Sequence, residues 1–147
     1  MTLRDVILAV EAEAKAQPAV KMIVRNDIFR LNDMPDAEYG VFGWTQQQHS
    51  VGDGDLLRVT LNLWYVDRLN ENASNELEVQ SMGVQVLANV IRSLPAEGVY
   101  LAGEAAIRTF NQKFVDVCAG AFATLSLLAP VDTICETNYT DNSVPIL

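Results

Sequence analysis

The fold is decided by the stretch Leu56–Leu94, which reads LLRVTLNLWYVDRLNENASNELEVQSMGVQVLANVIRSL. Apolar and polar residues alternate from Leu56 to Val66, which is the pattern of a β-strand with one buried face. From about Asn75 to Leu94 the apolar residues recur instead at helical spacing and form one broad stripe, which includes Val79, Met82, Val86 and Val90. A strand, a polar loop and an amphipathic helix therefore follow one another, and the helix is expected to cover the apolar face of the strand.

Two predicted hairpins supply most of the sheet. Residues 39–48 form a strand that pairs with the strand described above, because the turn sequence Gly52-Asp53-Gly54 lies between them. Residues 105–110 and 114–128 form the second hairpin, around the polar turn Asn111-Gln112-Lys113. The last of these strands carries small apolar residues, which allow a helix or a neighbouring sheet to approach closely.

Two helices are predicted to flank the sheet. The first spans about residues 2–17, where Thr2 and Asp5 have the spacing of a reciprocal N-terminal cap. In the second helix, Asn75 is followed three positions later by Glu78, which has the same spacing. We therefore expect both helices to begin at a capping side chain.

These elements, with a short strand at residues 20–24, predict an α+β fold: a mainly antiparallel sheet of two hairpins packed against two helices. Residues 1–130 are expected to form one domain. Beyond it the periodicity ends, and residues 131–147 contain three acids and no Lys or Arg. We predict that this segment is an extended C-terminal arm, either frayed or ordered on a neighbouring molecule.

Composition and charge exclude several classes of function. The chain has 147 residues and a formal net charge of -9, with 10 Lys and Arg against 19 Asp and Glu. Because nucleic-acid affinity comes largely from clustered Lys and Arg, direct nucleic-acid binding is not expected. No apolar run approaches the roughly 20 residues of a membrane-spanning helix. The first residues lack the pattern of a secretory signal, so we expect neither membrane insertion nor export.

The sequence contains no recognised catalytic motif. A glycine-rich phosphate loop and a nucleophile elbow are both missing. His49 is interpreted as a surface or turn residue, since a catalytic base needs a partner and a pocket. Cys118 and Cys135 are expected to be reduced, and with His49 they fit no metal-site spacing. Asp53 and Asp55 lack the downstream glutamate of a calcium loop. We predict no catalytic residue, no metal and no cofactor, and hence a protein that is not an enzyme.

The remaining candidates are surfaces for contact with other proteins. Trp44 and Trp64 lie on neighbouring predicted strands, and on a common uncovered surface they would form an exposed aromatic patch. The alternative is that helices bury both. Asp67 and Glu71 belong to an acidic run before the second helix, which suits either helix capping and solubility or a basic partner. Asp53 marks the tip of the first hairpin.

Three segments resemble a family of small virion proteins from tailed bacteriophages, especially those of the crAss-like group and of other phages with Bacteroidetes hosts. The likeness lies in residues 59–69 (VTLNLWYVDRL) and 75–81 (NELEVQS), which lead into the helix. It continues in residues 110–116 (FNQKFVD), followed by the long strand of small apolar residues. About half of the chain takes part. Proteins of this kind look like tail-terminator or tail-completion components, with a sheet flanked by helices.

The resemblance implies a structural virion protein, a ring subunit at the head-tail connector (neck) or tail that acts in tail completion or head-tail joining. Its partners would be copies of itself and other neck, portal or tail proteins. Its location would be the virion, assembled in the host bacterial cytoplasm. Such a subunit needs segments that reach its neighbours. We predict this role for the hairpin tip near Asp53 and for the arm, with Val144 and Ile146.

A different class of function is also compatible with the sequence. An α+β domain of this size can act as a monomeric ligand-binding or regulatory domain. The ligand would then lie between the sheet and its helices. The mass of the purified protein in solution separates the two hypotheses.

Overall fold

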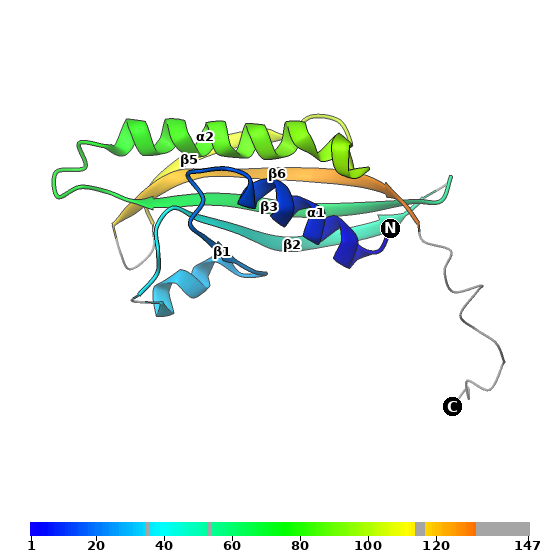
Figure 1. Cartoon of the computed structure of the whole chain (residues 1–147), viewed down its shortest axis with the longest axis horizontal. Helices are drawn as coiled ribbons and strands as arrows, with labels where there is room; N and C mark the ends of the chain where they lie inside the picture. The colour runs from blue at the N-terminus through cyan, green and yellow to red at the C-terminus, as the bar shows by residue number, and fades with distance from the viewer. Residues whose placement is uncertain (35, 53, 114–116, 132–147) are drawn as a thin grey trace, which may run out of the picture.

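The computed structural model describes residues 1–34, 36–52, 54–113 and 117–131. The fold is α+β with a mostly antiparallel sheet, as predicted (Figure 1). Only Val131 of the predicted arm belongs to the described residues. The elements, in chain order, are α1 (Leu3–Lys15), β1 (Met22–Val24), the 3-10 helix η1 (Ile28–Asp33), β2 (Val41–Val51), β3 (Leu56–Arg68), α2 (Glu76–Ser93), the 3-10 helix η2 (Leu94–Glu97), β4 (Tyr100–Leu101), β5 (Ala106–Lys113) and β6 (Cys118–Pro130).

The described residues form a six-stranded sheet in the order β1-β2-β3-β6-β4, with β5 also paired to β6. β1 runs parallel to β2, and the other pairs are antiparallel. β3 and β6 pair along their whole length, from Leu56 opposite Pro130 to Arg68 opposite Cys118. These two strands are the centre of the sheet.

The two edges of the sheet are unlike each other. One is β1, which has three residues. The other consists of β4 and β5, which pair one after the other with the side of β6 that faces away from β3. Between them the register shifts around Gly103, whose φ of 77° is readily adopted only by glycine. At this second edge, β4 and β5 thus act as one edge strand that is interrupted between them.

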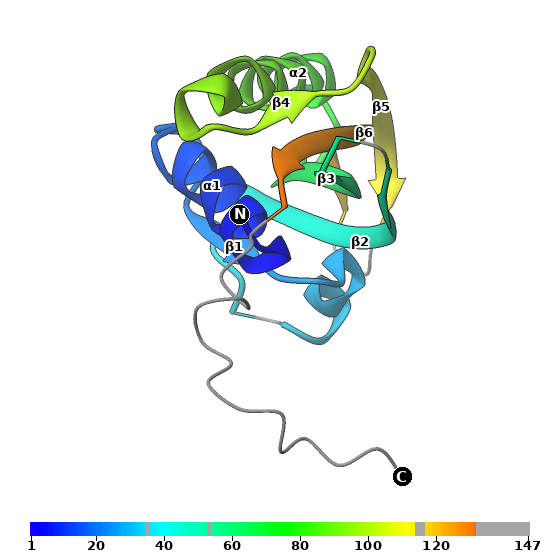
Figure 2. The ribbon, with the colours of Figure 1, turned by 90° about the vertical axis from the view of Figure 1, so that its right-hand side faces the viewer.

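Apolar clusters occupy both faces of the sheet. α1 and α2 cover one face, while η1 packs against the other (Figure 2). The alternation in β3 explains the division, because successive side chains of a strand point to opposite faces. The larger cluster joins Val6, Val10, Val86, Leu87, Phe42, Leu61, Leu63, Tyr65, Ala121 and Leu125. The smaller one joins Val24, Ile28, Leu31, Val41, Trp64, Val66, Phe110 and Cys118.

The two helix starts differ from each other. In α1 the predicted cap is confirmed: the Thr2 hydroxyl accepts from the Asp5 backbone N–H, and the Asp5 carboxylate accepts from that of Thr2. In α2 the predicted cap by Asn75 is wrong, because its side chain makes no capping bond within the described residues. The Asn75 amide instead accepts from the backbone of Asn70 and donates to the carbonyl of Arg68, which closes the loop after β3.

The apolar stripe of α2 is buried as predicted at Val79, Val86 and Val90, and it differs from the prediction at Met82. Met82, predicted to face the sheet, is exposed, whereas Gly83 is buried. A Cβ atom at Gly83 would lie 3.0 Å from both the Cβ and the backbone nitrogen of Ala121. The helix therefore approaches β6 at a pair of small residues, and this close contact fixes which side faces inward.

The predicted turn at residues 111–113 is also wrong. β5 continues to Lys113, opposite Cys118, with a register shift between Asn111 and Lys113. Polar residues are tolerated there because β5 is an edge strand with one side open to solvent. The three polar residues therefore belong to the end of this edge strand and not to the turn between the strands.

Candidate interaction surfaces

The two tryptophans lie on opposite faces of the sheet. Trp44 on β2 is opposite Leu63 on β3, and Trp64 is the next residue along β3. Their exposed fractions are 6% and 7%. The prediction of an exposed aromatic patch on a common surface is therefore wrong, because both tryptophans are buried.

Trp64 is buried in an aromatic cluster on the η1 face. Its ring stacks on Phe122, with ring centroids 5.0 Å apart. It meets Phe110 and Phe29 edge to face, at centroid distances of 5.7 and 6.0 Å. Such pairs favour burial beyond their area alone. The cluster explains why a tryptophan stands on the more polar side of the β3 pattern.

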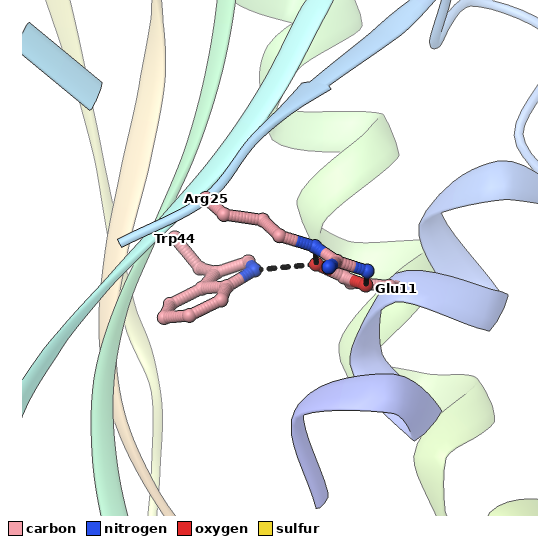
Figure 3. A network of polar contacts seen from close by, with 3 residues as sticks. All are labelled: Glu11, Arg25 and Trp44. Carbon is pink, nitrogen blue, oxygen red and sulfur yellow. Dashed lines mark hydrogen bonds and ion pairs between the residues drawn. The ribbon is translucent and has the colours of Figure 1, made fainter. Parts of the chain in front are cut away.

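Trp44 belongs to a polar network under α1. Its indole N–H donates to Glu11 at 2.8 Å, and the Arg25 guanidinium donates to both oxygens of the same carboxylate at 2.8 and 2.6 Å (Figure 3). Glu11 is only 1% exposed. Burial favours the neutral acid, but the hydrogen bonds from Arg25 and Trp44 outweigh it, and the pKa of Glu11 lies below its ordinary value. The network ties α1 to the sheet.

Sequence reasoning missed this network. Glu11 follows Ile7 by four positions and so falls on the buried face of α1. An acid on the apolar side of a helix is a signal that a partner is needed. Nothing in the spacing identifies that partner, because Arg25 and Trp44 lie 14 and 33 residues away.

A groove lies beside this network, between α1 and β2. We call it the α1–β2 groove; it has a volume of about 330 Å³. Apolar side chains and two arginines line it, and none of the described lining residues is acidic. The lining residues are Leu3, Arg4, Ile7, Leu8, Arg25, Trp44 and Gln46.

The predicted acidic run lies at the end of β3 that leads into α2, beside a second and larger cavity of about 540 Å³. Asp67 lines this cavity with Lys21, Glu78 and Tyr65. The Tyr65 hydroxyl donates to Asp67 over 3.5 Å, and burial together with this carboxylate raises the pKa of Tyr65 to about 12. Glu71 is exposed in the loop before α2 and does not line the cavity. The two predicted acids thus have different surroundings.

Exposed apolar side chains form two further surfaces. The tip surface, at the end of the β2–β3 hairpin, has Val51 and Leu56, and Val51 is 63% exposed. The helix surface, on the outer side of α2, has Leu77 and Met82, and Leu77 is 77% exposed. β3 has 13 residues between the tip and the loop that leads into α2. At about 3.3 Å per residue, the two surfaces lie some 30 to 40 Å apart.

Three predicted interface residues, Asp53, Val144 and Ile146, lie outside the described residues. In the described part of the chain, no three His, Cys, Asp or Glu side chains gather where they could hold a metal ion. That part also has no helix long and apolar enough to cross a membrane. The sequence matches no model of a known protein family and no curated protein.

Proposed function

We propose that this chain is a structural virion protein of a tailed bacteriophage. It is a subunit of a ring at the neck or tail and acts in tail completion or head-tail joining. The sequence resemblance supports the phage role. The tip surface and the helix surface, two different apolar surfaces at opposite ends of one subunit, support assembly into a ring.

A ring requires contact between two different surfaces. When the tip surface of one copy meets the helix surface of the next, each copy keeps one free surface, and addition continues until the ring closes. A stable interface buries roughly 1,200–2,000 Å² in total, which is more than four apolar side chains supply. The predicted arm, packed on the adjacent copy or on another virion protein, would add the missing area.

Two double variants test the head-to-tail contact. Val51→Glu with Leu56→Glu blocks the tip surface, and Leu77→Glu with Met82→Glu blocks the helix surface. Each variant alone is expected to be monomeric. All of its copies lack the same surface, so no copy can offer the partner surface that the contact requires. Their mixture is expected to give a 1:1 pair and nothing larger, since one free surface of each remains. Native mass spectrometry and light scattering report the masses, with the wild type as the ring.

Tyr100→Glu is the matched control, because Tyr100 is an exposed aromatic residue on β4, outside both surfaces. It should leave the ring intact. A wild-type chain that stays monomeric at every concentration would contradict the ring. Variants that each form the wild-type oligomer would contradict these two surfaces.

The place of the chain in a virion has its own test. Mass spectrometry of purified virions should find the chain as a structural component. Deletion of residues 131–147 should impair its incorporation and leave a folded monomer, because the arm is proposed to contact neighbouring molecules and its described residue, Val131, belongs to no strand or helix. The deletion removes the backbone hydrogen bond from Val131 to Asp55, which is at the exposed end of the hairpin. Complete virions that contain the shortened chain would refute the role of the arm, and virions without the full-length chain would refute the phage role.

The cavity beside Tyr65 favours one alternative, a monomeric ligand-binding or regulatory domain. It combines an apolar wall with Lys21, Asp67 and a tyrosine hydroxyl that stays protonated near neutral pH. Such a mixture of apolar walls and a few polar groups is typical of small-molecule sites. A persistent monomer whose ligand is lost on Tyr65→Phe substitution would support this alternative over the ring.

A further inference from the structure

The α1–β2 groove is fixed before anything enters it. Trp44 forms part of its wall, and Arg25 lies at its side. Both side chains are held by hydrogen bonds to the buried carboxylate of Glu11 (Figure 3). Because these groups are already ordered, a segment that docks there does not have to order them.

The charge of the groove matches one segment of this chain. Residues 132–147 contain Asp132, Glu136 and Asp141, with apolar residues between and after them, and no Lys or Arg. The α1–β2 groove offers apolar walls with Arg4, and with Arg25, whose charge is already balanced by Glu11. The larger cavity beside Tyr65 is lined by Asp67 and Glu78 as well as Lys21, so it repels a segment of this charge more strongly.

The chain leaves the sheet in a fixed direction. β6 runs antiparallel to β3 and therefore ends at the hairpin tip, where Pro130 is opposite Leu56. The Pro130 carbonyl accepts from the Met1 nitrogen at 2.7 Å, and the Val131 N–H donates to the Asp55 carbonyl at 2.8 Å. Trp44 is opposite Leu63, about 23 Å back along β3. The groove of the same copy begins at Leu3 and Arg4, close to Met1, and runs back toward Trp44. It therefore lies behind a chain that continues in the direction of β6.

We propose that the α1–β2 groove binds residues 132–147 of the neighbouring copy in the ring. This inference rests on the proposed function, because it needs a copy beyond the hairpin tip. Sixteen residues extend over at most about 50 Å, which is enough to reach a groove on that copy. The apolar residues of the segment pack against Ile7, Leu8 and Trp44, and its acids pair with Arg4, because Arg25 already pairs with Glu11.

Disulfide trapping between two full-length chains tests the contact. Both chains carry Cys135→Ser, and the other cysteine, Cys118, is buried. One chain has Leu8→Cys and an affinity tag, and the other has Ile146→Cys. After the two are mixed and oxidised with oxidised glutathione, a covalent pair between tagged and untagged chains is expected on a non-reducing gel.

Two controls make the result specific. Val84→Cys replaces Leu8→Cys with a cysteine of matched exposure, since Val84 is 37% and Leu8 36% exposed, and it should not link. Arg4→Glu should slow the linking about two- to fivefold at low salt, because it reverses one charge of the groove. Arg108→Glu, at an exposed position on β5, should leave the rate unchanged.

The outcomes separate this inference from the ring itself. If the chains still form the ring but no disulfide link appears, the docking in the groove is overturned and the ring is not. A monomeric chain without a link overturns both. A chain that carries both cysteines and links only within itself at high dilution shows its own arm in the groove, which also overturns the inference.

Discussion

Gly120→Ala is expected to lower the free energy of unfolding by at least about 3 kcal/mol, or to prevent folding. Gly120 lies in β6 between Val66 on β3 and Phe110 on β5. A Cβ atom there would overlap the carbonyl oxygen of Tyr65, a backbone atom of the adjacent strand. The overlap can be relieved only by moving β3 and β6 apart, and these are the two longest strands of the sheet.

Urea unfolding followed by circular dichroism measures this effect. Gly52→Ala is the control, because no heavy atom of the described residues lies within 4 Å of an added Cβ at Gly52. Its stability should stay within about 0.5 kcal/mol of the wild type. Equal midpoints for the two alanine variants would show that β3 and β6 are not packed as described.

Glu11→Ala is expected to lower the free energy of unfolding by about 2 to 4 kcal/mol. The substitution leaves the buried indole N–H of Trp44 without its acceptor and removes both hydrogen bonds to Arg25. Arg25 is largely exposed and regains water, so most of the cost comes from Trp44 and from the space left under α1. Glu13→Ala is the matched control on the same helix. Burial and the neighbouring Glu97 raise the pKa of Glu13, so its charge does not stabilise the fold.

The contribution of Glu11 depends on pH in a defined direction. Its pKa in the folded chain lies below the ordinary value of 4.5, so the folded state favours the ionised form. The stabilisation is present in full well above pH 4.5 and is lost as the pH falls through the lower folded pKa. The stability difference between the wild type and Glu11→Gln should therefore be constant near neutral pH and narrow in acid. A gap that widens in acid would contradict the ionised network.

Most of the fold could be predicted from local patterns. The alternation in β3 and the glycines before it were enough to predict the β2–β3 pairing, because strand period and turn chemistry are properties of neighbouring residues. The Thr2–Asp5 cap is local in the same way. The start of α2 was not predictable, because Asn75 closes a loop with Asn70 and Arg68 rather than capping its own helix.

The candidate surfaces were harder to predict than the fold. Met82 is exposed, against the prediction, and Gly83 faces the sheet because Ala121, far along the chain, lies too close to the helix for a larger side chain. Trp64 is buried because Phe29, Phe110 and Phe122 come together from three separate segments. The α1–β2 groove likewise depends on contacts between residues that are distant in sequence. Local periodicity carries no information on such contacts.

The unlike edges of the sheet bear on how the chain behaves when it is abundant and unassembled. Long, regular edge strands act as templates for fibrils, in which copies add strand to strand without limit. Here β1 is short and stands between Lys21 and Arg25, and the other edge is interrupted at Gly103. Growth by continued strand pairing is thus disfavoured at both ends. For the proposed ring, this means that a pool of free subunits could accumulate until side-chain contacts select the correct neighbour, and assembly would stop at a fixed number of copies.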